Sequence, residues 1–139
     1  MTFLADVNVL VDLALDRQPW STAAKSLFDA AAAGGHVVHI AATTLPTLFY
    51  VVEKFSDTAR AFEAIDRSLA AAEIIEANRA TILAARAMSG RDFEDNVQIA
   101  CAVSAGVDRI VTRNPSDFAS SPIPVMSPTD LLDAITGRP

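Results

Sequence analysis

The sequence has little of several features that mark whole classes of protein. Its 139 residues include one cysteine, Cys101, which leaves no partner for a disulfide framework and no basis for a thiolate metal cluster. No apolar run reaches the roughly 18 residues that a transmembrane helix needs, because charged residues interrupt every run. The first residues lack the basic segment and apolar core of a signal peptide. We therefore expect a protein without a membrane anchor that is located in the cytoplasm.

A surplus of basic residues is also missing. The net charge of −6 at pH 7 argues against a protein that coats nucleic acid, because such proteins usually carry a basic surface. It leaves open an enzyme that contacts RNA through a few arginines and a bound metal ion, or a basic partner protein. Hydrophobic residues make up 51% of the chain and charged residues 20%, which predicts a folded protein. We expect one domain over residues 1–139 with a sizeable core.

Short apolar runs alternate with longer helical patterns, which predicts an α/β domain with a mainly parallel sheet. Strands are expected at 3–6, 37–41, 73–75, 109–112 and 123–126. Helices are expected at 9–15, 22–33, 45–54, 58–71, 79–88 and 93–104, and from 128 onward. The helix starts carry residues that commonly cap helices, namely Ser21, Asp57, Asn78, Asp92 and Ser127.

Aspartates stand where these elements meet. Asp6 ends the first strand, Asp117 follows the fourth, and Asp92 and Asp95 open the helix at 93–104. Ligands of open parallel sheets bind beyond the carboxyl ends of the strands, so acids at such positions can converge. Carboxylates that gather there repel one another unless a hard cation such as Mg²⁺ or Mn²⁺ holds them together. The pattern therefore indicates metal-dependent phosphodiester chemistry.

Each of these residues also has a purely structural interpretation. Asp6 lies between a strand and a helix, where aspartate is a common cap. Asp92 and Asp95 have the spacing of a capping residue and its third-position partner, and a helix macrodipole stabilises acids there. Asn114 precedes a proline and is equally suited to start a turn, which Asp117 is placed to cap. The residues alone leave both interpretations open.

Other polar residues near the strand ends have more limited roles. Asn8 is expected to order the first turn through side-chain hydrogen bonds. Thr112 and Arg113 lie where the chain leaves the fourth strand, a usual place for ligand contacts. We take Asn8, Thr112 and Arg113 as candidates for substrate binding. Asp12 and Glu94 are expected to face solvent.

Several short motifs stand in order along nearly the whole chain. The first is DVNVLVD at 6–12, and RQPW follows at 17–20. The later ones are DFED at 92–95, AG at 105–106, IVTRN at 110–114 and DF at 117–118. Each motif is short, but the set is fairly specific, and it resembles the PIN domain family. The segment at 6–12 is similar to the opening motif of that family, the later segments are similar to its second half, and RQPW suits one prokaryotic branch.

The resemblance implies a three-layer α/β/α sandwich with a mainly parallel sheet of four or five strands. It also implies an acidic pocket that binds Mg²⁺ or Mn²⁺ and, in many members, cleavage of single-stranded RNA. Many small prokaryotic members are VapC-type toxins, which are neutralised by an antitoxin protein and are commonly homodimeric. We therefore expect a metal-dependent endoribonuclease with an RNA substrate, an antitoxin partner and a homodimeric state.

The resemblance also assigns residues. Asp6 and Asp95 match two acids of the family and are candidates for catalysis and for metal binding. The last family position varies between acid and amide, and Asp117 and Asn114 cover it here as a catalytic candidate and a metal ligand respectively. Asp92 matches an additional acid of this branch and is a further candidate metal ligand.

One departure from the family matters for activity. The family usually places a glutamate early in the helix after the second strand, and the aligned residue here is Thr47. Glu53 lies six residues further along, about 9 Å by helical rise, and is a poor substitute. The loss of one carboxylate would weaken a second metal site most. The alternative is therefore a PIN-like domain with little or no activity that binds RNA or protein.

Two other acidic α/β classes fit the sequence poorly. A phospho-receiver domain needs an aspartate at the end of its third strand and a lysine near the end of its last. The segment EIIEAN at 73–78 provides no such aspartate, and no lysine follows Lys54. A haloacid-dehalogenase-like phosphatase would need a second aspartate at the position of Asn8.

Overall fold

The apolar runs form one parallel sheet in the computed structural model, which describes residues 1–138. Within these residues the strands are β1 (Thr2–Ala5), β2 (Val37–Ala41), β3 (Glu73–Ile75), β4 (Arg109–Val111) and β5 (Val125–Met126). Their order across the sheet is β3-β2-β1-β4-β5, and every neighbouring pair is parallel. The expected parallel sheet of four or five strands is confirmed.

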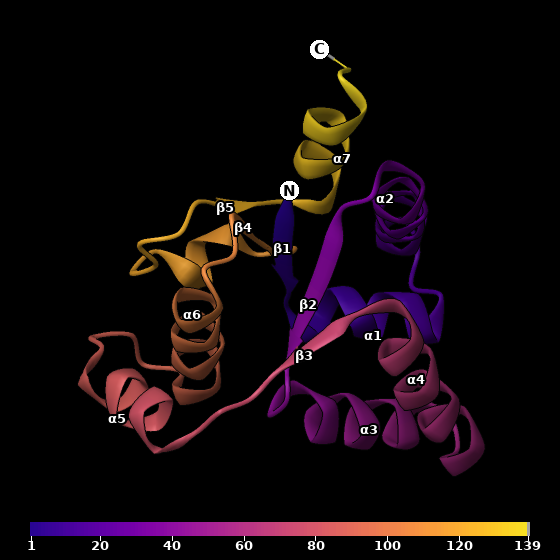
Figure 1. Ribbon diagram of the computed structural model, residues 1–139. Helices are drawn as coiled ribbons and strands as arrows, with labels where there is room; N and C mark the ends of the chain where they lie inside the picture. Colours follow the sequence, from indigo (N-terminus) through magenta and orange to yellow (C-terminus); the bar gives the residue numbers. More distant parts are fainter. Residues whose placement is uncertain (139) are drawn as a thin grey trace.

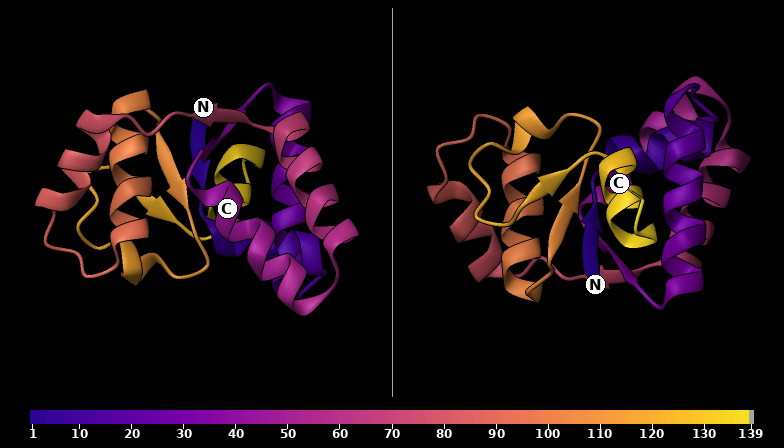
Figure 2. Two further views of the ribbon diagram at one scale, coloured as in Figure 1. Left: turned by 90° about the horizontal axis from the view of Figure 1, so that it is seen from below. Right: turned by 90° about the horizontal axis from the view of Figure 1, so that it is seen from above.

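Helices cover both faces of the sheet (Figure 1). The described helices are α1 (Val7–Leu15), α2 (Trp20–Gly34), α3 (Thr44–Phe55), α4 (Thr58–Ala71), α5 (Arg79–Ala87), α6 (Phe93–Ala105), α7 (Pro128–Thr136) and the short 3-10 helix η1 (Pro115–Phe118). Figure 2 shows α5 and α6 on one face, and α1 to α4 with α7 on the other. The expected three-layer α/β/α sandwich is therefore confirmed.

The order of the strands places β1 in the middle of the sheet. From β1 the chain adds β2 beside it and then β3 beside β2, and the helices that connect these strands lie on one face of the sheet. It then returns through α5 and α6 on the opposite face and adds β4 on the other side of β1. The carboxyl ends of the neighbouring strands β1 and β4 consequently lie side by side, with the backbone N–H of Asp6 donating to the carbonyl of Val111 at 3.0 Å.

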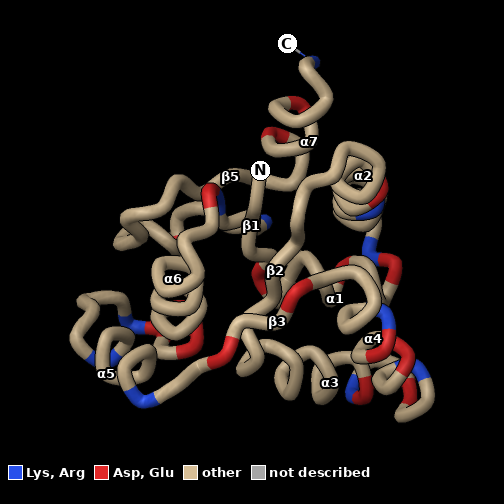
Figure 3. Tube along the Cα trace, viewed as in Figure 1, with Lys and Arg blue, Asp and Glu red and all other residues tan. Residues whose placement is uncertain are grey.

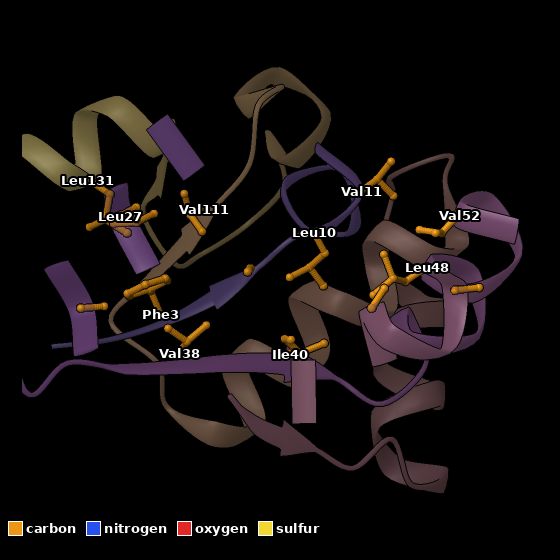
Figure 4. Packing of buried hydrophobic residues seen from close by; sticks show 14 residues of the cluster. Phe3, Leu10, Val11, Leu27, Val38, Ile40, Leu48, Val52, Val111 and Leu131 are labelled. Carbon is orange, nitrogen blue, oxygen red and sulfur yellow. The ribbon is translucent and has the colours of Figure 1, made fainter. Parts of the chain in front are cut away.

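Alternation along the strands divides the hydrophobic core between the two faces. Phe3 and Ala5 pack with the helices α1 to α4 and α7, whereas Leu4 packs with α5 and α6. Val111 and Ile110 on β4 divide in the same way. Figure 4 shows the first of these clusters around Phe3. Because successive side chains of a strand point to opposite faces, such a sheet needs apolar residues at every position.

Most of the expected helix caps are present. Side chains of Asp57, Asn78, Asp92 and Ser127 each accept a hydrogen bond from a backbone N–H in the first turn of the following helix. The expectation for Ser21 is wrong, because α2 already begins at Trp20. Ser21 is buried in the first turn, and its hydroxyl donates to Asp16 Oδ1 at 2.8 Å.

Across residues 1–138, no helix is both long enough and apolar enough to cross a membrane.

Candidate functional site

Asp6 is the centre of a polar cluster at the carboxyl ends of β1 and β4. It is the N-cap of α1, and only 3% of its surface is exposed. Its Oδ1 accepts from the backbone N–H of Val7 at 2.7 Å and from Gln98 Nε2 at 2.8 Å. Its Oδ2 accepts from Thr112 Oγ1 at 2.8 Å. Two bonds occupy Oδ1, but Oδ2 keeps an acceptor position free of these partners.

The pKa of Asp6 is raised above its ordinary value of 3.8, chiefly because burial disfavours the carboxylate. The bonds from Gln98, Thr112 and Val7 act in the opposite direction, and the negative charge of Asp117 adds to the rise. The three donors therefore offset part of the cost of holding a charge in the protein interior. They also fix the direction of the carboxylate.

Thr112 and Asn8 join the ends of the two strands. Thr112 is fully buried, and besides donating to Asp6 it accepts from Asn8 Nδ2 at 3.3 Å and from the backbone N–H of Asn114 at 3.1 Å. Asn8 Oδ1 in turn accepts from the backbone N–H of Arg113 at 3.3 Å. The expectation that Asn8 orders the first turn is therefore wrong, because Asn8 lies in α1 and its side chain instead bonds to the chain leaving β4. Contact of Asn8, Thr112 or Arg113 with a substrate stays a prediction, and the buried Thr112 would act through Asp6.

Helix α6 brings two more acids to this edge. Asp92 is its exposed N-cap, and Asp92 Oδ1 accepts from the backbone N–H of Asp95 at 3.1 Å. Asp95 is half-buried, and its pKa is raised from 3.8 to about 7. Burial is the largest cause, followed by repulsion from Asp92, Asp6, Asp117 and Glu94 in that order. Four acids from three segments, namely the end of β1, the start of α6 and η1, are thus close enough to act on Asp95. The structural role of Asp92 as a cap is confirmed.

The segment after β4 supplies the last candidates. Asp117 lies inside η1 and is exposed, and its charge raises the pKa of both Asp6 and Asp95. Asn114 precedes η1 and is exposed, with its backbone N–H rather than its amide group bonded to Thr112. Asp117 therefore joins the acidic cluster electrostatically, and Asn114 is tied to the exit of β4 through its backbone.

Glu94 does not face solvent, so that expectation is wrong. Its side chain is half-buried, and Oε2 accepts from Thr47 Oγ1 on α3 at 2.9 Å. Its pKa is raised by burial, against the effect of the Thr47 bond, and further raised by the charges of Asp92 and Asp6. Glu94 is thus a fifth member of the acidic cluster, which comprises Asp6, Asp92, Glu94, Asp95 and Asp117. Figure 3 shows acidic positions at the amino end of α6.

Gln98 is a functional candidate that the sequence reasoning missed. It is fully buried on α6, and because a carboxylate only accepts, its amide nitrogen must be the atom that faces Asp6. Its Oε1 is buried without a hydrogen-bond partner among the described residues. The sequence did point to Gln98, because it is a polar residue inside the apolar run VQIACAV at 97–103. Buried positions in such a run usually hold apolar residues.

Asp12 is buried rather than solvated, which corrects a second expectation. One of its oxygens forms an ion pair with Arg113 Nε at 3.1 Å, and the other accepts from Arg113 Nη2 at 3.3 Å. The guanidinium of Arg113 also lies 4.1 Å from the ring centre of Trp20. Arg113 therefore ties α1, the exit of β4 and the start of α2 together, which limits its freedom to reach a phosphate.

The chemistry of these donors fits a hard divalent cation. All five acidic cluster members offer carboxylate oxygens, which Mg²⁺ and Mn²⁺ prefer, and no sulfur or imidazole donor belongs to the cluster. Within residues 1–138, no three His, Cys, Asp or Glu side chains are close enough together to enclose an ion. The carboxylates would have to draw closer to share one. Asp6 Oδ2 has a free acceptor position for an ion, and the positive charge of the ion would offset the repulsion that acts on Asp95.

A hollow between helices on one face of the sheet is unrelated to the acids. A pocket of about 310 Å³ is lined by residues of α1, α2, α3 and α4, including Leu10, Phe28, Leu48 and Ala64. No member of the acidic cluster lines it. Its lining is largely apolar, so hydrolytic chemistry is better placed at the sheet edge.

The arrangement of strands, helices and acids has a counterpart among known proteins. The sequence model of a family described as PIN domain matches residues 2–116, which span both Asp6 and the acids of α6. The chain belongs to the PIN domain family. The sequence-based recognition of that family is confirmed. No functionally curated protein matches the chain significantly.

Solved structures with the same fold include several toxin–antitoxin proteins. DNA-bound VapBC from Salmonella typhimurium superposes with a TM-score of 0.72 at 18% identity, covering 92% of this PIN domain chain and 98% of that chain. A toxin–antitoxin complex from Klebsiella pneumoniae has a TM-score of 0.66 at 25% identity, with 90% and 96% covered. VapC20 of Mycobacterium tuberculosis, described as a toxin that cleaves the sarcin-ricin loop, has a TM-score of 0.65 at 15% identity, with 78% and 86% covered. This PIN domain is thus VapC-like in fold.

Proposed function

We propose that this PIN domain is a metal-dependent endoribonuclease that cleaves single-stranded RNA. The observation that carries the proposal is the convergence of Asp6 and Asp95. Asp6 directly follows the central strand and Asp95 lies in the first turn of α6, yet the charge of Asp6 contributes to a pKa of about 7 at Asp95. Acids from distant parts of a chain rarely approach in this way unless they share a ligand or a reaction.

Asp6 and Asp95 would hold a Mg²⁺ or Mn²⁺ ion, with Asp92, Asp117 or Asn114 contributing directly or through water. When bound, such an ion lowers the pKa of a coordinated water and neutralises charge that develops on phosphate oxygens. The hydrogen bonds from Gln98 and Thr112 direct the Asp6 side chain and favour its ionised form. Asp117, which is exposed in η1, would accept a proton from the attacking water. The basic residues that would meet RNA are few, in line with the net charge of −6.

Cleavage assays with a short fluorescent single-stranded RNA test this function. We expect cleavage with Mg²⁺ or Mn²⁺, none with EDTA, and a loss of at least about 100-fold in Asp6→Asn, because the remaining ligands lose the residue that anchors the ion. Asp66→Asn is a matched control, since Asp66 is exposed on α4 and outside the acidic cluster. Equal activity in the wild type, with EDTA and in Asp6→Asn would reject the proposal.

A specific observation keeps a second function in view, namely an RNA- or protein-binding domain that does not cut. Thr47 occupies the helix position where the sequence resemblance leads us to expect a glutamate. Calorimetry with Mn²⁺ separates the two functions. Absence of binding at millimolar Mn²⁺, together with retained RNA binding, would favour the second function.

We also infer that the chain works as the toxin of a VapBC-type pair, as a homodimer in the cytoplasm. The toxin–antitoxin complexes among the structural neighbours support this. So does the set of large apolar side chains exposed on α3 and α4, which comprises Tyr50, Phe55, Phe62 and Leu69. Size-exclusion chromatography with light scattering tests the dimer. Growth arrest on expression, relieved by a neighbouring gene product, tests the toxin role.

A further inference from the structure

A hydrogen bond between α3 and α6 crosses the edge of the sheet at which Asp6 lies. Thr47 stands in the first turns of α3, which begins three residues after the end of β2. Glu94 stands in the first turn of α6, 47 positions further along the chain. Thr47 Oγ1 donates to Glu94 Oε2 at 2.9 Å, and both side chains are half-buried. Since β2 is the neighbour of β1, the bond lies beside the carboxyl end of the central strand.

The bond gives Thr47 and Glu94 complementary roles. A threonine hydroxyl is a donor that fixes one carboxylate oxygen, here Oε2, and leaves Oε1 available. Glu94 also follows the N-cap Asp92 and precedes Asp95, so its backbone is held by the same helix start that carries the other acids. The half-buried side chain therefore has a defined direction, toward α3. If Glu94 only stabilised the start of α6, it would not need this hydrogen bond from Thr47 on α3.

We propose that Glu94 is a metal-binding carboxylate of this site and that Thr47 is the residue that positions it. The carboxylate on the α3 side of the site is then supplied by α6, with a hydroxyl on α3 as its support. The proposal rests on the proposed function, because it assigns residues to the same metal site. It predicts that the threonine at position 47 does not leave the site short of one acid. The charges of Asp92 and Asp6 raise the pKa of Glu94, after the larger effect of burial, which is in keeping with this arrangement.

Three variants separate this role from a structural one. Glu94→Gln keeps an oxygen that can accept from Thr47 but removes the charge. Thr47→Val keeps the shape of the residue and removes the donor. The double variant Thr47→Glu with Glu94→Gln moves the carboxylate from α6 to α3. Glu53→Gln is the matched control, because it makes the same glutamate-to-glutamine change as Glu94→Gln. Glu53 lies on α3 about 9 Å beyond Thr47 by helical rise.

Mn²⁺ affinity from calorimetry is the main measurement, with thermal melting in EDTA to confirm that each variant folds. We expect Glu94→Gln to weaken Mn²⁺ binding by at least about 10-fold and Thr47→Val by up to about 10-fold, as for residues that support a ligand. The double variant should recover most of the affinity, and Glu53→Gln should match the wild type. RNA cleavage should follow the same order.

Each result has one interpretation. Wild-type Mn²⁺ affinity in a folded Glu94→Gln variant would overturn the inference, and if Asp6→Asn still abolished binding, the proposed nuclease site itself would stand. A Thr47→Val variant that melts at a lower temperature but binds Mn²⁺ normally would assign the bond to helix packing alone and would also overturn it. A wild-type protein that binds no Mn²⁺ at millimolar concentration would remove the proposed function and this inference together.

Discussion

Replacing Asp95 with asparagine should stabilise the metal-free protein at neutral and alkaline pH. Burial and the neighbouring acids raise the pKa of Asp95 from 3.8 to about 7, so the ionised side chain is less stable in the folded protein than in the unfolded chain. A pKa difference of about 3 corresponds to at most about 4 kcal/mol. Asparagine keeps the size of the side chain and removes the charge.

Two effects reduce this upper value. Solvent screens a half-buried carboxylate, so only part of the difference appears as stability. The variant also loses the attraction between an acid in the first helical turn and the macrodipole of α6, about 0.5 kcal/mol. We expect a net gain in the free energy of unfolding of about 1–2 kcal/mol at pH 8. The corresponding rise in Tm is roughly 3–8 °C.

The stabilisation by Asp95→Asn should depend on pH and should be largest above pH 7. Because the folded-state pKa is raised, the ionised carboxylate destabilises the protein above pH 7, and this penalty declines as the pH falls from 7 toward 3.8. The advantage of Asp95→Asn should therefore shrink steadily and vanish near pH 4. Urea unfolding in EDTA at several pH values measures it, with Asp66→Asn as control. A variant that is less stable than the wild type at pH 8, or a gain independent of pH, would refute the reasoning.

Three further predictions concern Asp95, Gln98 and the ion pair of Asp12 with Arg113. The Mn²⁺ affinity measured by calorimetry should fall up to about 10-fold for each pH unit below 7, because protons compete with the ion for Asp95. An affinity that does not change between pH 5 and 7 would contradict this. Gln98→Leu should weaken Mn²⁺ binding and destabilise the protein by about 1–3 kcal/mol in urea unfolding, since Asp6 loses a buried donor; unchanged Mn²⁺ affinity would show that Gln98 has no role in positioning Asp6. Arg113→Met should cost about 3–5 kcal/mol of unfolding free energy by leaving Asp12 buried and unpaired, and the additional change Asp12→Leu should recover most of it. Equal stability of the single and double variants would show that the pair is not coupled.

Much of the fold could be predicted from the sequence because local patterns and global topology agree. The strands at 37–41 and 73–75 and the helix at 58–71 have the expected bounds. Apolar runs bounded by glycine or by capping residues define these elements without help from tertiary contacts. The start of α2 departs from the pattern because Ser21 bonds to Asp16 in the turn before it, a contact that sequence spacing does not reveal.

The site divides in a similar way. The approach of Asp6 and Asp95 at one edge of the sheet could be predicted, because each stands at the end of an element whose direction the topology fixes. Glu94 and Asp12 could not, because their environments depend on single partners far away in the chain, Thr47 and Arg113. Helical periodicity places a side chain on a face, but it does not say whether a donor on another helix lies opposite. Long-range hydrogen bonds are therefore the part of the site that sequence reasoning misses.

The central place of β1 has a consequence for how the site responds to its ligands. Asp6 is anchored by paired strands on both sides and by three donors, so it is the least compliant member of the acidic cluster. Asp95 and Asp117 stand instead on a helix start and on a short 3-10 turn at the margin of the sheet. If the acids draw closer around an incoming ion, the start of α6 and η1 should therefore move toward Asp6, while Asp6 stays in place. Hydrogen exchange should record that asymmetry as slowed exchange at the start of α6 and in η1, with β1 unaltered.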